Sequence, residues 1–405
     1  MFAVFKIYRE AFGGLSANSW MLALIMFINR SGSMVIPFMS IYLKDELNMS
    51  LTDAGILMAV FGIGSIMGSF LGGFLTDRIG HFKVQFISLI TGGSMFFVLM
   101  FMKDFYSFLI CILFLSTLLQ MLPPANASSV SFYAKPENVT RAFALNRMAL
   151  NLGFAIGPTM GGLIAAYSYD GLFIADGITC IAAGIVFWLY FRNKPGNKPD
   201  KEKVNNPVSK SPYRDPQFLW FVFMVSMFAV TFFQLFTTIP LYYRTEAFLS
   251  EEMVGLLLGL NGAIVFAFEM VIVHKLKDRK NLGQIIIAGI LLMSASYLLL
   301  NVNTSLAVLI LSMILLSFAE IFAMPFMATI TVQRSDEQNR GRYMGLYTFA
   351  FSLAFAIAPY SGTYIADAAG FDALWIVMSI ASVAVAVGFR IMLHGMIWKP
   401  LKKQE

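Results

Sequence analysis

The sequence predicts an all-α polytopic membrane protein with twelve transmembrane helices in two related six-helix bundles. The 405-residue chain is 58% hydrophobic and only 13% charged. A soluble protein of this length needs about a quarter of its residues charged to cover its surface. The apolar segments are continuous runs and do not alternate with polar residues, which favours membrane helices over a β-barrel. Several residue pairs also recur at one fixed separation, which indicates an internal repeat.

Twelve helices account for the apolar runs. We expect them over residues 17–43, 52–75, 83–102, 105–130, 140–167, 171–191, 217–243, 253–275, 283–301, 305–331, 342–366 and 373–397. The uncharged run 281–319 must contain a turn, because one helix of that length would measure about 58 Å at ~1.5 Å per residue. That is nearly twice the hydrocarbon thickness of a bilayer. No small-residue cleavage site follows the first apolar run, so we expect it to be a retained helix.

The basic residues predict how the helices are oriented. Of the 29 Lys and Arg residues, 23 fall on the side that carries both termini. Only Lys44, Lys103 and Arg244 fall on the opposite side. By the positive-inside rule this imbalance places both termini in the cytoplasm. We therefore expect a multi-pass protein of a bacterial inner (plasma) membrane, and the net charge of +6 requires no nucleic-acid partner.

One hydrophilic segment divides the chain. Residues 192–216 are dominated by Pro, Asn and Lys, which is typical of a flexible linker. The predicted domains are an N-terminal bundle at residues 1–191 and a C-terminal bundle at residues 217–405. We expect the chain to work as a monomer.

The two halves share residues at a separation of 201. The matching pairs are Asp77-Arg78 with Asp278-Arg279, Pro124 with Pro325, Arg141 with Arg342, Pro158 with Pro359, and Gly161 with Gly362. Two related bundles are the arrangement in which a transporter holds its substrate between halves that move around it.

The segment "GGFLTDRIGHFK" (residues 72–83) resembles the signature G-x-L-A-D-R-x-G-R-K of the major facilitator superfamily. The matching residues are Gly73, Asp77, Arg78 and Gly80. His81 and Phe82 replace the usual basic pair. The resemblance covers essentially the whole chain and implies transport by alternating access. It also implies that Asp77 and Arg78 act as a cytoplasmic latch that favours the outward-open state, the alternative being a basic loop that only sets topology.

The segment "GFAIGPTMGG" (residues 153–162) is similar to the antiporter signature G-x-x-x-G-P-x-x-G-G of the same superfamily. The matching residues are Gly153, Gly157, Pro158, Gly161 and Gly162. This resemblance indicates the drug:proton antiporter branch. Glycines spaced by four allow helices to approach closely, and a proline within a helix removes an amide and bends it. Simple helix packing is the alternative role for this motif.

Four charged residues inside the predicted helices are candidates for a part in transport. Glu320 in "SFAEIFAMP" is about fifteen residues into the tenth helix, where a charge costs about 2.5–3.5 kcal/mol. Arg30 lies in the first helix, Arg147 in the fifth and Glu269 in the eighth. The family arrangement implies that Arg30 faces Glu320 across a central cavity. It likewise implies that Arg147 meets Glu269 at a gating interface between the halves. Purely structural ion pairs are the alternative.

Six polar residues are candidates for the lining of the substrate cavity. They are Asn29, Gln120, Asn126, Asn151, Gln234 and Asn261. Interhelical hydrogen bonding, worth about 0.6 kcal/mol on average, is the alternative for each. The fourth helix lacks the arginine that the antiporter branch usually carries in its middle, and Arg30 could supply that cation.

These observations predict a proton-coupled transporter. A carboxyl group in a central cavity can bind and release a proton as the cavity empties and fills, so Glu320 is the expected proton carrier. The leading hypothesis is an antiporter that exports amphipathic small molecules, driven by the proton gradient with no other cofactor. The first-helix Arg and tenth-helix Glu also resemble those of proton-coupled peptide symporters, so import of peptides or another polar nutrient is the alternative. No metal-ligand cluster, nucleophile–base set or phosphate loop appears in the sequence, so we expect no enzymatic activity.

Overall fold

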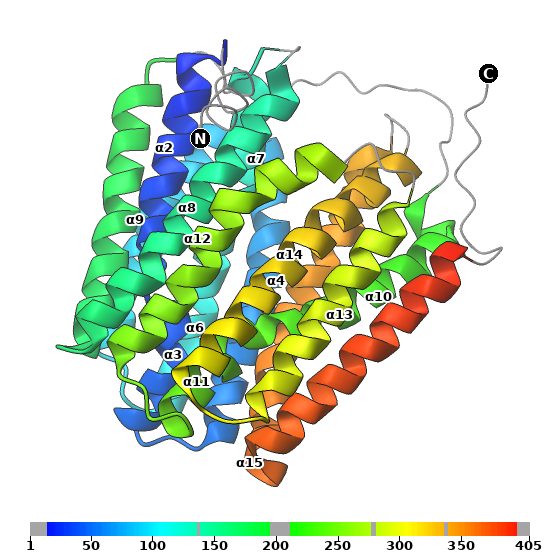
Figure 1. Ribbon diagram of the computed structural model, residues 1–405. Coiled ribbons are helices and arrows are strands. Elements are labelled where there is room, and N and C mark those ends of the chain that lie inside the picture. Colours follow the sequence, from blue (N-terminus) through cyan, green and yellow to red (C-terminus); the bar gives the residue numbers. More distant parts are fainter. Residues whose placement is uncertain (1–13, 136–137, 195–210, 277–280, 336–338, 395–405) are drawn as a thin grey trace. The chain divides into compact units, whose positions relative to one another are not determined.

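The computed structural model describes residues 14–135, 138–194, 211–276, 281–335 and 339–394. All regular elements within these ranges are helices (Figure 1). The elements of the first half are α2 (Ala17–Ser31), α3 (Val35–Asp45), α4 (Leu51–Ile79), α5 (His81–Met100), α6 (Phe105–Gln120), α7 (Leu122–Tyr133), α8 (Val139–Ala165) and α9 (Tyr169–Phe191). The elements of the second half are η2 (Pro212–Arg214), α10 (Pro216–Phe232), η3 (Phe233–Phe236), α11 (Thr238–Thr245), α12 (Glu251–Leu276), α13 (Leu282–Leu300), α14 (Leu306–Arg334) and α15 (Arg340–His394).

The described residues contain eleven segments long and apolar enough to cross a membrane. The last of them, Arg342–Met392, has 51 residues and would measure about 76 Å as one straight helix at ~1.5 Å per residue. It is interrupted at Gly370, whose φ of 85° and ψ of 166° are not helical. If the parts of this segment before and after Gly370 are counted as two helices, the described residues contain twelve membrane-spanning helices. The predicted all-α polytopic fold is therefore confirmed.

Three predicted spans are interrupted helices. The first span consists of α2 and α3, the fourth of α6 and α7, and the seventh of α10, η3 and α11. In the fourth span, Pro123 and Pro124 occupy the first turn of α7. A proline there has no N–H to donate to the preceding turn, which explains the interruption.

The chain forms two compact units. Unit 1 contains residues 1–49, 63–201 and 249–266, and unit 2 contains residues 50–62, 202–248 and 267–405. Helices α4 and α12 are each divided between the units. The domain boundaries predicted at residues 191 and 217 stay a prediction, and residues 195–210 of the predicted linker lie outside the described residues.

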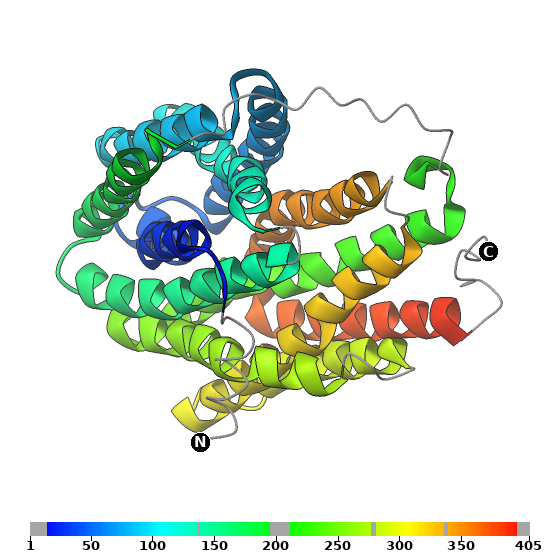
Figure 2. The same cartoon turned by 90° about the horizontal axis from the view of Figure 1, so that it is seen from above.

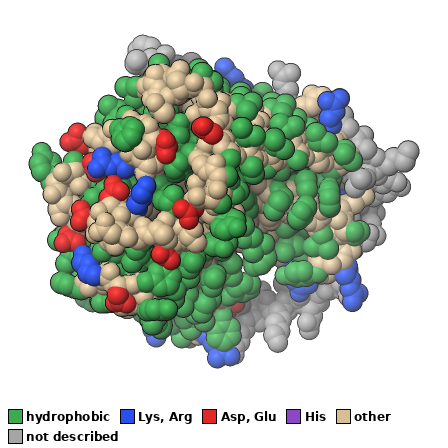
Figure 3. Space-filling view, turned by 90° about the horizontal axis from the view of Figure 1, so that it is seen from below, with side chains coloured by type: hydrophobic (Ala, Val, Ile, Leu, Met, Phe, Trp, Pro, Cys, Tyr) green, Lys and Arg blue, Asp and Glu red, His purple; other side chains and the backbone are tan. Residues whose placement is uncertain are grey.

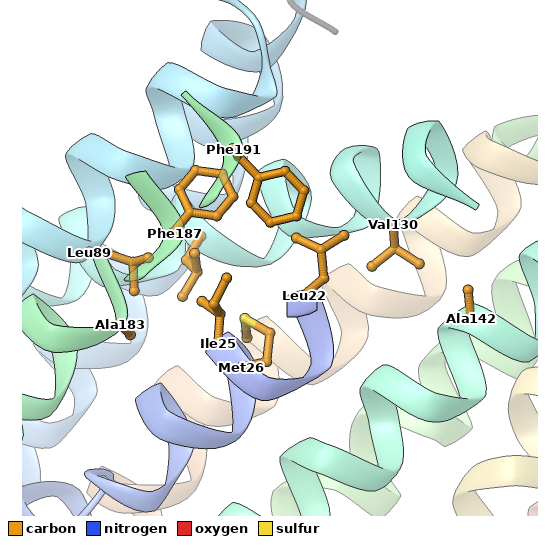
Figure 4. Packing of buried hydrophobic residues seen from close by; sticks show 10 residues of the cluster. Leu22, Ile25, Met26, Leu89, Val130, Ala142, Ala183, Phe187 and Phe191 are labelled. Atoms are coloured by element: carbon orange, nitrogen blue, oxygen red, sulfur yellow. The ribbon is translucent and has the colours of Figure 1, made fainter. Parts of the chain in front are cut away.

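The core of unit 1 brings together α2, α5, α7, α8 and α9. Figure 4 shows Leu22, Ile25 and Met26 of α2 directed toward Phe187 and Phe191 of α9. All five side chains are at most 3% exposed. In a bilayer, lipid tails are as apolar as these side chains, so close packing rather than the hydrophobic effect holds such helices together.

The core of unit 2 is rich in aromatic residues. Trp375 of α15 stacks on Tyr297 of α13, with ring centroids 5.6 Å apart and planes 3° apart. Tyr242 of α11 meets Trp375 edge-on at 5.3 Å and donates a hydrogen bond to the Leu300 carbonyl at 2.8 Å. These contacts connect the seventh, ninth and twelfth spans.

Two helix crossings within the units repeat each other. In unit 1, the first part of α12 lies beside α8 (Figure 2). A Cβ at Gly262 would lie 2.6 Å from the Ala155 Cα. In unit 2, α4 crosses α15, and a Cβ at Gly62 would lie 2.3 Å from the Ala356 Cα. Both glycines are therefore required by close backbone approach. The separation is 201 residues between Ala155 and Ala356 and 200 between Gly62 and Gly262.

The turns that precede α4 and α12 also match. Asn48 and Phe248, 200 residues apart, both adopt left-handed backbone conformations, with φ of 52° and 51°. Phe248 is 85% exposed. Charged side chains gather over part of the molecular face in Figure 3, and hydrophobic side chains cover much of the rest.

Candidate transport site at the break in the first span

The first span is broken after Arg30. Helix α2 ends at Ser31 and α3 begins at Val35. Across the break, the Ser33 amide donates to the Arg30 carbonyl at 3.0 Å. Breaks in membrane helices occur where other groups satisfy the freed backbone, and transporters build their binding sites at such breaks.

Asp176 of α9 satisfies the exposed start of α3. Its Oδ1 accepts a hydrogen bond from the Met34 amide at 2.9 Å, and its Oδ2 accepts one from the Val35 amide at 3.1 Å. The first amides of a helix have no partner within the helix, and a carboxylate is a strong acceptor for them. The Asp176 side chain is only 2% exposed. It therefore caps α3 from inside unit 1.

The glycines of the 153–162 motif lie against the same break. A Cβ at Gly153 would lie 2.8 Å from the Arg30 Cβ, and one at Gly157 would lie 3.2 Å from the carbonyl oxygens of Arg30 and Ser33. At Gly161 it would lie 3.0 Å from the Met34 Cβ. These glycines give the broken segment room against α8.

Gly162 and Pro158 lie where α8 packs against α12. A Cβ at Gly162 would lie 2.5 Å from the Glu251 carbonyl oxygen of α12. A Cβ at Gly255 of α12 would lie 2.4 Å from the Pro158 carbonyl oxygen. The motif thus packs α8 against the first span with three glycines and against α12 with the fourth.

Arg30 and Asn29 face α9 at the same level as Asp176. The Asn29 amide donates to the Cys180 Sγ at 3.1 Å. Arg30 is half-buried and interacts electrostatically with Asp176 and Cys180. Asp176 and Cys180 are four residues apart, so they share one face of α9. The structure therefore brings Asn29 and Arg30 together with a carboxylate.

Glu320 lies at the middle of α14. It is the fifteenth of the 29 residues of this helix, and Arg334 at its end is the only other charged residue in it. The side chain is half-buried, and Pro325 follows within the helix. Glu320 belongs to unit 2 and Arg30 to unit 1, so their pairing stays a prediction.

The predicted gating pair is also divided between the units. Arg147 of α8 lies in unit 1 and is exposed, whereas Glu269 of α12 lies in unit 2 and is 8% exposed. Their pairing stays a prediction.

The remaining predicted cavity residues differ in how they are engaged. Gln234 is fully buried, its amide donates to the Ala358 carbonyl at 3.1 Å, and its Oε1 accepts from the Thr238 hydroxyl at 2.6 Å. Asn126 is 4% exposed and accepts from the Gln85 amide at 3.4 Å. Asn261 is 2% exposed, whereas Gln120 and Asn151 are half-buried. A substrate-binding role stays a prediction for all of these residues.

The predicted latch motif ends α4. Asp77 and Arg78 are exposed, and the Arg78 guanidinium lies 4.2 Å from the centre of the Phe74 ring. Gly80 has a φ of 89°, which favours glycine, and begins the turn into α5. A Cβ at Gly73 would meet nothing within 4 Å, so local packing does not require this glycine. The repeat partners Asp278 and Arg279 lie outside the described residues, and the latch stays a prediction.

Asp176 and a second buried acidic residue, Asp215, are not among the sites predicted from the sequence. Asp176 carried the same signal as Glu320, an acidic residue inside an apolar run, here in "LFIADGITC". Its partners are backbone amides of a helix break, which no pattern in the sequence reveals.

Asp215 caps α10 and pairs with Arg334 of α14. Arg334 Nε donates to Asp215 Oδ2 at 2.9 Å and Nη2 donates to Oδ1 at 3.1 Å, while the Tyr343 hydroxyl donates to Oδ2 at 3.1 Å. Burial alone would raise the pKa of Asp215. Hydrogen bonds from Arg334, the Phe218 amide and Tyr343, with the Arg334 charge, outweigh it and hold this pKa below its ordinary value.

Comparison with known proteins identifies relatives along most of the chain. The model of the Major Facilitator Superfamily matches residues 20–333 and 250–403. An uncharacterized MFS-type transporter, YttB, of Bacillus subtilis (strain 168) is 25% identical over 87% of this chain and 89% of its own length. A Na(+), Li(+), K(+)/H(+) antiporter of Planococcus maritimus is 24% identical over 90% of this chain and 92% of its own. The multidrug resistance protein MdtH of Yersinia pestis (strain Pestoides F) is 24% identical over 82% of both chains.

Solved structures share the fold. A POT family transporter, crystallised with a thioalcohol conjugated peptide, superposes with a TM-score of 0.76 at 17% identity, over 91% of this chain and 94% of its own. A bacterial homologue of the human lysosomal transporter Spinster superposes with a TM-score of 0.79 at 13% identity, over 95% and 98% of the two chains. With the twelve helices, the internal repeat and the family match along the chain, this protein belongs to the Major Facilitator Superfamily and is a membrane transporter, not an enzyme.

Proposed function

We propose that this transporter is a proton-coupled antiporter that exports amphipathic small molecules by alternating access. The observation that carries the proposal is the position of Glu320 at the midpoint of an otherwise apolar α14. Ionisable residues at such depth are costly and typically serve ion or proton pathways. Relatives named as a cation/proton antiporter and as a multidrug resistance protein support the same reading. We further propose that the protein is a monomer whose termini lie in the cytoplasm of a bacterial cell.

In the proposed cycle Glu320 binds a proton when the empty cavity faces outward and releases it when the cavity faces the cytoplasm. A cationic substrate favours the ionised carboxylate, so substrate and proton compete for the same group. Arg30 would take the place of the fourth-helix arginine of the antiporter branch. This competition couples inward proton movement to outward substrate movement.

Proteoliposomes with an imposed pH gradient test the role of Glu320. The probe is tetraphenylphosphonium, with a trapped pH dye reporting proton flux. We expect Glu320→Gln to abolish gradient-driven accumulation of the probe because the amide cannot exchange a proton. Glu252→Gln, which changes an exposed glutamate at the start of α12, is the matched control and should transport normally. Undiminished proton-driven transport by Glu320→Gln would remove this residue from the mechanism.

A proton-coupled symporter of peptides is the second candidate. It is supported by the placement of an Arg beside the first-span break and a Glu in the tenth span, and by the fold shared with a POT family transporter. Gradient-driven uptake of labelled dialanine, with no movement of tetraphenylphosphonium, would favour import over export.

A further inference from the structure

A buried carboxylate in the sixth span is not used by the proposed proton cycle. Asp176 is 2% exposed, and both of its oxygens accept backbone amides from the first residues after the break. Burying a carboxylate is unfavourable unless hydrogen bonds and a counter-charge compensate it. Here two amide donors and the positive charge of Arg30 act against that cost.

The contacts on every side favour a broken helix over a continuous one. In a continuous α-helix the Met34 and Val35 amides would bond to the carbonyls of residues 30 and 31. A carboxylate buried at the Asp176 position would then lose both of its amide donors. Thr179 of the same α9 face occupies the space beside Gly32, where a Cβ would lie 1.7 Å from its hydroxyl oxygen. The break and the two hydrogen bonds that Asp176 accepts therefore depend on each other.

We propose that Asp176 is a positioning residue of the transport cycle, whose carboxyl group keeps the first span broken after Arg30 by accepting both backbone amides. Loss of one acceptor oxygen frees α3 to rejoin α2 as one helix, which displaces Arg30 and the neighbouring carbonyls. This proposal goes beyond the proposed function, because it concerns the shape of the first span whichever solute is carried and in whichever direction.

The groups packed around this part of α9 come from α2, α5 and α8. Among the described residues, the titratable groups that act on it are Arg30 of α2 and Cys180 of its own helix. Helix α8 presents Gly153 and Gly157 to the break. Helix α5 meets this part of α9 through Gly93, whose Cβ would lie 2.9 Å from the Cys180 Cβ. Protonation of either Asp176 oxygen would replace an acceptor by a hydroxyl that faces an N–H donor.

Pulsed electron paramagnetic resonance distances between spin labels at Ala17 and Glu46 test the proposal without any substrate. Both positions are exposed, one at each end of the first span, and the background carries Cys111→Ser and Cys180→Ser. We expect Asp176→Asn to lengthen or broaden the distance distribution toward the roughly 44 Å of a continuous helix. The matched control is Asp170→Asn, an exposed acid on the first turn of α9, which should leave the distribution unchanged. An unchanged distribution in Asp176→Asn would overturn the proposal.

Transport measurements separate positioning from simple folding. At equal amounts of protein in the membrane, we expect Asp176→Asn to lower the maximal tetraphenylphosphonium rate about tenfold or more with little change in KM. Asp176→Glu, which keeps both acceptor oxygens, should lose less than about threefold. If Asp176→Asn fails to accumulate in the membrane, the label distances of Asp176→Glu decide the question. An unaltered distance distribution in an accumulating Asp176→Glu variant supports the proposal. An altered distribution contradicts it. Absence of probe transport in wild-type protein would count against the proposed antiport only, because the distance measurement does not use the probe.

Discussion

The interrupted first and seventh spans occupy equivalent places in the two units but are stabilised differently. In unit 1 the neighbouring α8 carries Gly153 and Gly157, and Asp176 reaches the break from α9. In unit 2 the positions 201 residues later are Ala354, Ala358 and Val377. There the break is filled by Gln234 from within the seventh span itself, bonded to Ala358 and Thr238. The repeat has kept an interrupted helix in both units while placing a buried charge at only one of them.

At the starts of the same two spans, the charged contact is in unit 2 and the neutral one is in unit 1. In unit 2, Asp215, Arg334 and Tyr343 form a buried charged cluster. In unit 1 the equivalents of Arg334 and Tyr343 are Tyr133 and Ala142, and the Ser16 hydroxyl donates to the Tyr133 carbonyl at 3.1 Å. A buried acidic side chain thus caps a helix at the α2–α3 break in unit 1 and at the start of α10 in unit 2. The first has backbone amides as its partners, and the second has a bidentate Arg334 and the Tyr343 hydroxyl.

Removing one partner of the unit 2 cluster should have the largest effect on stability. Arg334→Leu leaves the 6% exposed Asp215 carboxylate without its counter-charge, and such changes typically cost about 3–5 kcal/mol. We expect a clearly lower unfolding temperature in detergent, measured by tryptophan fluorescence. A variant with Ser16→Ala, which removes the equivalent neutral bond in unit 1, should lose only about 1 kcal/mol. Equal losses would show that the charged contact in unit 2 and the neutral one in unit 1 do not differ.

Glycine-to-alanine exchange in α8 tests whether the unit 1 break needs its extra space. Gly157→Ala places a Cβ 3.2 Å from two backbone oxygens and should cost about 1–3 kcal/mol. Ala358→Gly makes the opposite change in unit 2 and should cost no more than about 1 kcal/mol. Chemical denaturation of the two variants measures the difference. Tolerance of Gly157→Ala would mean that α8 can yield and that the glycine is not required by the break.

Replacement of Gln234 tests whether a neutral side chain is enough to hold the unit 2 break. Gln234→Leu removes the bonds to Ala358 and Thr238 at a fully buried position, so we expect a loss of about 1–3 kcal/mol. Amide hydrogen exchange over α11 should rise in this variant and not over α3. A rise over both segments would indicate that the two breaks are not independent.

Asp215 in unit 2 should contribute to the acid dependence of stability. The pKa of Asp215 is lower folded than unfolded, so its contribution is present above the unfolded value of about 3.9 and is lost as pH falls through the folded pKa. Wild-type protein should therefore lose unfolding temperature below about pH 4. Asp215→Asn should start lower and show a shallower decline between pH 6 and pH 3. Parallel profiles would assign the acid sensitivity to other groups.

The smallest effect is expected at the exposed ion pair of unit 1. Lys103 Nζ lies 3.6 Å from Asp170, and both side chains are more than half exposed. Because solvent screens such pairs, Lys103→Met should change stability by less than about 1 kcal/mol. A differential scan against wild-type protein at low salt checks this, and a larger loss would point to the Tyr42 hydroxyl that Lys103 also contacts.

Hydropathy and basic-residue patterns were sufficient to predict the spans, because membrane crossing depends on length and composition alone. The glycines of 153–162 were also recognised, but not the broken helix that they accommodate. The interruption at Ser31–Met34 escaped prediction because its amides are satisfied by Asp176, about 140 residues away in the sequence. Glu320 was found because it stands alone in its helix, whereas its pairing with Arg30 stays a prediction because no single helix pattern contains it.

The matched left-handed turns before α4 and α12 have a consequence of their own. Asparagine tolerates the left-handed conformation, whereas phenylalanine rarely adopts it. The turn at Phe248 therefore has a backbone conformation that its residue type disfavours. The two turns thus follow the same backbone course although only the first has a residue suited to it. Phe248→Asn would therefore relieve local strain without altering the route of the backbone into α12.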